Sequence, residues 1–149
     1  MPGSPSMQTQ NSFCTFRVGT MYLGVEVHRV QEVIRAQRMT RVPGAPDVVR
    51  GLMNLRGQIV TALDMRRRLG LEETESKEPQ MNVVVRTPDG PVSLLVNEIG
   101  DVIVVDRTQF EAPPETLQGI HRELIGGSYK LQGRLLLVLN LDAAVRLAA

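Results

Sequence analysis

Residues 51–71, GLMNLRGQIVTALDMRRRLGL, contain two apolar runs separated by the pair Arg56-Gly57. Apolar and β-branched residues favour pleated strands, and glycine readily adopts the positive φ angle of a tight turn. The pattern therefore predicts a β-hairpin that carries the Arg56 guanidinium near its tip. Asp64 can cap a following helical turn, and Gly70 suits the end of that turn. From chemistry alone, Arg56 is either a recognition residue on a rigid turn or a solvated turn residue.

The whole chain has the composition of an ordinary globular protein. It has 149 residues, a hydrophobic content of 42% and a net charge of +1. This length allows a hydrophobic core, and the balanced charge argues against a general binder of nucleic acid or anionic membranes. The single Cys14 cannot form an internal disulfide, which favours a reducing compartment. Because no apolar run approaches the roughly 18 residues of a membrane helix, we expect a cytoplasmic protein.

Two polar stretches mark the expected edges of folded structure. The first twelve residues, MPGSPSMQTQNS, lack the positive start and the apolar centre of a signal peptide. We expect a disordered tail over residues 1–12 and a single folded domain over residues 13–149. The stretch EETESKEPQ at residues 72–80 predicts a solvated loop, because its glutamates have no apolar neighbours that would tune them as general acids.

Short strand patterns recur along the folded part. Residues 13–18 and 21–26 flank a Gly19-Thr20 turn, and apolar residues in 27–34 recur every three or four positions, which fits a helical turn. Further strands are expected at residues 83–85, 92–96, 102–105, 124–130 and 134–139, and a C-terminal helix from Asn140 or Asp142 through Ala148. Many short strands with glycine-bearing turns predict a mainly β chain of small closed barrels.

The residues give little sign of catalysis or of metal binding. His28 and His121 lie far apart and Cys14 has no CxxC partner, so we expect no metal site. Nucleotide-binding glycine motifs and a GxSxG motif are also missing, and we expect no cofactor and no enzyme activity. The basic run at residues 66–68 is interpreted as partly solvated and partly paired with acidic neighbours. It leaves a small RNA-binding β-barrel as the alternative function, provided that the run shares an exposed face with Arg56.

Several motifs in a fixed order make the sequence resemble the CheW-type coupling proteins of bacterial chemosensory arrays. The resemblance covers nearly all of residues 13–147. Its most specific parts are VQEV at 30–33, RGLMNLRGQIV at 50–60, LDMRRRLGL at 63–71, LLVNEIGDV at 94–102 and GRLLLVLNLD at 133–142. It implies two intertwined five-stranded β-barrels that share a hydrophobic core, with short helices and a C-terminal helix.

The resemblance also implies a function without catalysis. Family members are adaptors that bind the cytoplasmic tip of methyl-accepting chemoreceptors and the regulatory domain of the histidine kinase CheA. Such a protein would be cytoplasmic and recruited to membrane receptor arrays, with neither nucleic acid nor a direct membrane insertion among its partners. By matching position, the receptor-binding residues would be Val27, Val30, Glu32, Gly51, Arg56 and Met81. An apolar trough would receive the ridge of a helix, and the two charges would fix its register.

Two parts of this assignment stay open at the level of sequence. Val30 fits an ordinary core position as well as it fits a receptor contact. Kinase contacts are expected near Thr116 and Leu117, at an exposed apolar end of one barrel. The sequence also has Ser93 where the family usually has glycine, a difference that we expect to affect strand edges and partner preference more than the fold.

Overall fold

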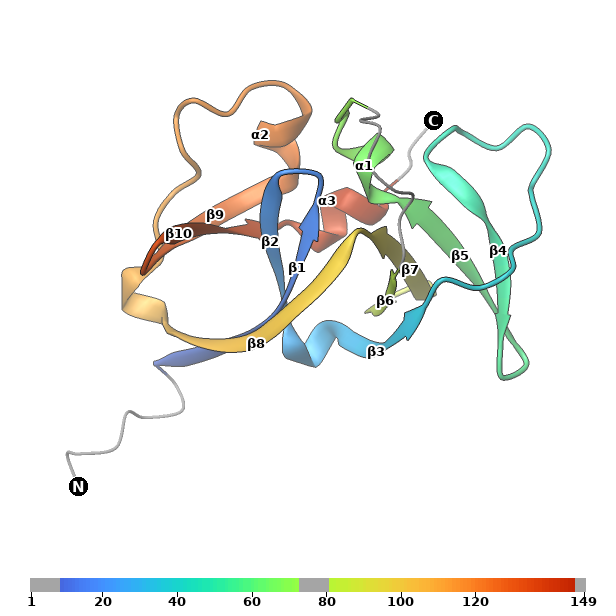
Figure 1. Ribbon diagram of the computed structural model, residues 1–149, viewed down its shortest axis with the longest axis horizontal. Coiled ribbons are helices and arrows are strands. Elements are labelled where there is room, and N and C mark those ends of the chain that lie inside the picture. The colour runs from blue at the N-terminus through green and yellow to red at the C-terminus, as the bar shows by residue number, and fades with distance from the viewer. Residues whose placement is uncertain (1–8, 73–80, 147–149) are drawn as a thin grey trace.

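The computed structural model describes residues 9–72 and 81–146, which contain ten strands and five short helical segments (Figure 1). The strands are β1 (Gln10–Val18), β2 (Met21–Glu26), β3 (Val30–Arg35), β4 (Val49–Leu55), β5 (Gln58–Asp64), β6 (Met81–Thr87), β7 (Gly90–Val96), β8 (Glu98–Asp106), β9 (Ile125–Leu131) and β10 (Arg134–Leu139). The helices are α1 (Met65–Arg68), α2 (Ile120–Leu124) and α3 (Leu141–Val145), with 3-10 turns η1 (Val27–Arg29) and η2 (Arg107–Gln109). Within the described ranges, no helix is long and apolar enough to cross a membrane.

The strands form two five-stranded sheets with the same pattern of parallel and antiparallel pairs. The first sheet has the order β8-β1-β2-β10-β9 and the second has the order β3-β6-β7-β5-β4. Each contains one parallel pair, β2 with β10 and β5 with β7, while its other pairs are antiparallel. The second sheet uses the middle of the chain, and the first uses both ends. This arrangement confirms the mainly β fold with two intertwined five-stranded units.

One hydrophobic core lies between the two sheets. Phe16 and Leu23 of the first sheet and Val83 and Leu94 of the second are all fully buried in it. Burial of such side chains is the main favourable contribution to folding, at roughly 1.5–3 kcal/mol each. The expected shared core is therefore confirmed, and it holds the two sheets as one unit. Smaller buried clusters lie within the first sheet (Phe13, Val105, Tyr129, Leu136) and within the second (Met53, Leu55, Val60, Val84).

The central hairpin forms as its local chemistry predicts. β4 and β5 pair from Leu55↔Gln58 outward, and Arg56 (φ 52°) and Gly57 (φ 86°) form the turn between them. Such consecutive positive φ angles are those of a type I′ turn, which suits the twist of two paired strands. The Asp64 side chain then caps α1 by accepting from the backbone N–H groups of Arg66 at 3.1 Å and Arg67 at 3.3 Å.

Two sequence-based expectations need correction. The helical turn expected over residues 27–34 is confined to η1, because Val30, Val33 and Ile34 instead form a strand that pairs with β6. The predicted tail over residues 1–12 is too long, since residues 10–12 pair with β8; residues 1–8 lie outside the described part of the chain. Most of the predicted loop at 72–80 also lies outside the described residues.

The serine that departs from the family pattern is satisfied inside the second sheet. Ser93 is fully buried and donates its hydroxyl to the Asn82 side-chain oxygen at 2.7 Å. Asn82 in turn donates its amide to the Arg35 carbonyl at 3.2 Å. A buried hydroxyl is tolerated when it has such a partner, so Ser93 is accommodated without disturbing the strand pairing around it.

Candidate functional site

Two of the expected receptor-binding residues, Val30 and Glu32, lie on β3, an edge strand of the second sheet. Val27 lies just before them in η1 and is 38% exposed. Val30 is half-buried: part of its surface packs against the main core, and the rest stays accessible to a partner. Met81 begins the neighbouring strand β6, where it pairs with Arg35 at the other end of β3.

The Arg56 guanidinium forms an ion pair with the Glu32 carboxylate. Arg56 is at the tip of the β4–β5 hairpin, whereas Glu32 is on β3, so the pair joins elements from the two opposite edges of the second sheet. The Arg56 side chain is 70% exposed, and that of Glu32 is 18% exposed. Because the Arg56 side of the pair is open to solvent, the pair contributes only about 0–1 kcal/mol to stability. Its more important effect is to place one charge of each sign at a defined position on the surface.

Gly51 is buried in β4 and makes close backbone contact with the segment before that strand. A Cβ atom at Gly51 would lie 2.7 Å from the Thr40 carbonyl oxygen. Thr40 and Leu52 exchange backbone hydrogen bonds of 2.7 Å and 2.8 Å at this point. Gly51 therefore allows residues 39–40 to lie against the hairpin, and it offers no exposed surface of its own to a partner.

Two apolar residues near this set were not singled out from the sequence. Val33 on β3 is 36% exposed, and Ile59, close to the hairpin turn, is 60% exposed. Isolated exposed apolar residues are common on protein surfaces, but these two share the second sheet with the Glu32–Arg56 pair. No sequence pattern distinguishes them from core residues, because their exposure depends on which elements cover the sheet.

Thr116 and Leu117 lie in the connection between η2 and α2. This connection and the β4–β5 hairpin occupy opposite ends of the molecule (Figure 1). Thr116 is exposed, while Leu117 is half-buried against the main core. The Leu117 N–H donates to the Pro114 carbonyl at 3.1 Å, which closes a turn around these positions. The expected kinase-binding residues are thus far from the hairpin that carries Arg56.

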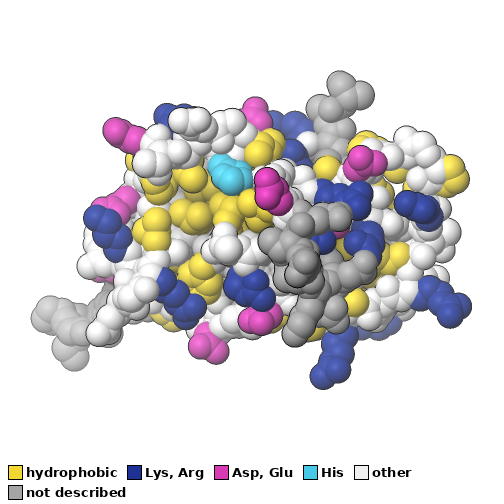
Figure 2. Space-filling model, turned by 45° about the horizontal axis from the view of Figure 1, so that its top comes forward, with side chains coloured by type: hydrophobic (Ala, Val, Ile, Leu, Met, Phe, Trp, Pro, Cys, Tyr) yellow, Lys and Arg dark blue, Asp and Glu magenta, His cyan; other side chains and the backbone are white. Residues whose placement is uncertain are grey.

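The basic run at residues 66–68 does not form an exposed basic surface. Arg66 is only 7% exposed, and the Arg67 guanidinium lies 3.7 Å from the Asp64 carboxylate. Arg68 donates to the carbonyl oxygens of Ala143 and Ala144 in α3, both at 2.9 Å. Figure 2 shows basic and acidic side chains interspersed over the face that it presents. The RNA-binding alternative required residues 66–68 to share one exposed face with Arg56. Because Arg66 is buried, this requirement is not met.

The titratable groups of the described residues show no arrangement typical of a reactive site. No group of three or more His, Cys, Asp or Glu side chains within residues 9–72 and 81–146 could hold a metal ion. Burial raises the pKa of the Cys14 thiol, which favours its unreactive neutral form. What the arrangement does show is a surface on which partly exposed apolar side chains lie on the same sheet as the Glu32–Arg56 ion pair.

Comparison with known proteins gives one consistent family. The family model described as "CheW-like domain" matches residues 12–149. The chain is 30% identical over 139 residues to the chemotaxis protein CheW of Bacillus subtilis (strain 168), covering 93% of this chain and 89% of that protein. It is 28% identical over 136 residues to CheW of Treponema pallidum (strain Nichols), covering 89% and 80%. The solved structure of the scaffolding protein TtCheW from Thermoanaerobacter tengcongensis has the same fold, with a TM-score of 0.79, 22% identity and coverage of 87% and 88%.

Proposed function

This chain belongs to the family of CheW-like domains, and from that premise we propose that it couples chemoreceptors to the histidine kinase CheA in a bacterial chemosensory array. Members of this family are chemotaxis adaptors, and the chain is accordingly a scaffold protein and not an enzyme. In this proposal, residues 13–149 act as one CheW-like domain. The protein is cytoplasmic, and its receptor contacts recruit it to the array.

The receptor partner in this proposal is the cytoplasmic tip of a chemoreceptor, which is a helical hairpin. Val27, Val30 and Met81 provide apolar contacts of the kind that receive the ridge of a helix. Glu32 and Arg56 place opposite charges beside these contacts, and such charges select the register of a partner more than they add affinity. Gly51 contributes by keeping the hairpin and residues 39–40 in close contact. The Glu32–Arg56 ion pair is the observation that carries this proposal.

The kinase partner is the regulatory domain of CheA, which we propose to bind near Thr116 and Leu117. Because these residues lie far from the hairpin tip, receptor and kinase can occupy the adaptor together (Figure 1). One protein that holds both partners raises their effective concentration for each other. A change in receptor conformation can then shift the population of kinase states, provided that the adaptor contacts the two states differently.

An Arg56→Ala variant tests the receptor site. We expect its affinity for a soluble receptor signalling fragment to fall by about three- to tenfold, because a charge that fixes register is lost. Its thermal stability should fall by no more than about 1 kcal/mol, since the Arg56 side chain is 70% exposed, and its affinity for the CheA regulatory domain should stay close to wild type. Binding is measured by co-sedimentation with receptor fragments and by titration calorimetry with the kinase domain.

Arg122→Ala is the matched control, because it removes the same charge from an exposed position on α2, outside the hairpin and the second sheet. It should bind the receptor fragment as the wild type does. Equal receptor binding by the Arg56 and Arg122 variants would contradict the assigned receptor site. A wild-type protein that binds neither receptor nor kinase would contradict the proposed function as a whole.

A further inference from the structure

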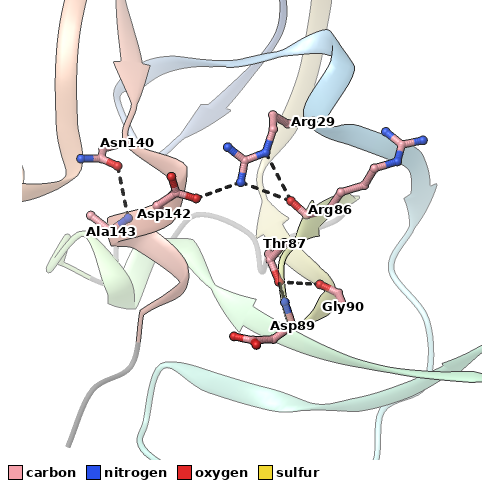
Figure 3. A network of polar contacts seen from close by, with 8 residues as sticks. All are labelled: Arg29, Arg86, Thr87, Asp89, Gly90, Asn140, Asp142 and Ala143. Carbon is pink, nitrogen blue, oxygen red and sulfur yellow. Dashed lines mark hydrogen bonds and ion pairs between the residues drawn. The ribbon is translucent and has the colours of Figure 1, made fainter.

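Two arginines, Arg29 and Arg86, tie the segment around η1 to the rest of the molecule, and Figure 3 shows the contacts of the Arg29 side chain. Arg86 on β6 donates from Nη1 to the carbonyl oxygens of His28 at 3.0 Å and Val30 at 2.8 Å. Arg29, which lies between those two residues, donates from Nε and Nη2 to the Arg86 carbonyl oxygen, both at 3.3 Å. Its Nη2 also forms an ion pair of 2.9 Å with the Asp142 carboxylate on α3.

These contacts occur where regular strand pairing is interrupted. β3 and β6 pair at Val30↔Val85 and again at Glu32↔Val84, with a register shift between the two pairs. A shift of this kind leaves backbone groups of the bulged strand without their usual partners and bends that strand. Unpaired backbone carbonyls must find another donor. The Arg86 guanidinium provides one for the carbonyls on both sides of Arg29, and a charged donor makes the stronger kind of hydrogen bond.

The bend that these bonds stabilise sets the direction of two proposed receptor contacts. The Val30 N–H donates to the Val27 carbonyl, which closes the η1 turn, and Val30 packs against the main core. The turn is thus held on one side by core packing and on the other by the Arg86 side chain. The bond from Arg29 to Asp142 extends the connection to the helix that follows the last strand of the first sheet.

We infer that Arg86 is a positioning residue for receptor binding, because it holds the η1 turn in the conformation that presents Val27 and Val30 to the helical tip of the receptor. This inference rests on the proposed function. A contact segment that is already ordered loses less conformational entropy when a partner binds. Without Arg86 the segment samples other conformations, and the apparent affinity falls with the fraction that stays competent to bind.

An Arg86→Ala variant tests the inference with two readouts. We expect its affinity for the receptor signalling fragment to fall by about three- to tenfold, which corresponds to the loss of one or two net hydrogen bonds. In the free protein, hydrogen exchange of the Val30 amide should become faster, since the turn that protects it opens more often. Binding to the CheA regulatory domain should not change. Arg86→Lys should recover part of the receptor affinity, and Arg122→Ala controls for the lost charge.

A Val30→Ala background separates positioning from a direct contact of Arg86 with the receptor. If Arg86 acts through the η1 turn, its substitution should have a smaller effect once the Val30 side chain is truncated, because the two changes remove one shared contribution. A loss of affinity that is equal in both backgrounds, with unchanged amide exchange, would mean direct contact and would overturn the inference. The inference would also be overturned if the wild type binds the receptor fragment and the Arg86→Ala variant binds it equally tightly.

Failure of the proposed function has a different signature. A wild-type protein that does not bind the receptor fragment refutes the receptor site, and with it the role of Arg86 in presenting that site. If the wild type binds while the Arg86 variant is indistinguishable from it, only the positioning role is refuted.

Discussion

Substituting Gly51 by alanine should destabilise the hairpin that carries Arg56. The new Cβ would lie 2.7 Å from the Thr40 carbonyl oxygen and 3.1 Å from the Met39 Cβ, and the first of these atoms is backbone that cannot rotate away. Residues 39–40 must therefore shift, which strains the two hydrogen bonds between Thr40 and Leu52. Overpacking of this kind costs about 1–3 kcal/mol, and each weakened hydrogen bond adds up to about 1 kcal/mol.

We expect a total loss of about 2 kcal/mol for Gly51→Ala. In a chain of this length, that loss lowers the melting temperature by about 4–8 °C. Thermal and urea unfolding followed by circular dichroism measure it directly. Gly126→Ala is the matched control on β9, because the nearest atoms to its Cβ are 3.8 Å and 3.9 Å away; it should stay within about 0.5 kcal/mol of wild type. A Gly51 variant as stable as the Gly126 variant would refute the close-contact argument.

Two further predictions concern buried groups. Asp64→Ala should lower the free energy of unfolding by about 1–2 kcal/mol in urea titrations, because the cap of α1 and the buried carboxylate beside Arg50 and Arg67 are both lost; an unchanged midpoint would contradict this. Native Cys14 should react slowly with a thiol reagent at pH 8 and rapidly in urea, because burial raises its pKa. Because the pKa of Cys14 is higher in the folded than in the unfolded protein, the thiol contributes stability below the unfolded pKa of about 8.5. This contribution is lost as the pH rises above that value, so the urea midpoint should fall between pH 8 and pH 10 by more in wild type than in Cys14→Ala.

Features that depend on local chemistry were predictable from the sequence. The Arg56-Gly57 turn needs only residues that accept positive φ, and the caps at Asp64 and Asn140 need only a side-chain oxygen before a helical turn. The strand at 30–35 was not predictable, because its partner β6 lies about fifty residues later, and local periodicity favoured a helix.

In the candidate site, too, individual residues were predictable but their contacts were not. Glu32 and Arg56 were each identified by resemblance to the CheW family, but only the fold shows that they form an ion pair. The contacts of Arg29 and Arg86 join residues 57 positions apart, and no motif marks them. The basic run at residues 66–68 was interpreted as partly solvated and partly paired with acidic neighbours, yet Arg66 is buried, and that burial depends on distant elements that the local sequence does not reveal.

The topology of the first sheet imposes an order on biosynthesis. The second sheet is complete once the ribosome has made residues 30–96, so all of its strands can pair while the remainder is still being translated. β2 must wait for β10, its parallel partner near the other terminus, and its open edge stays available to other strands during that delay. A chain released before residue 134 would keep the N-terminal hairpin but lack the strand that links it to β9.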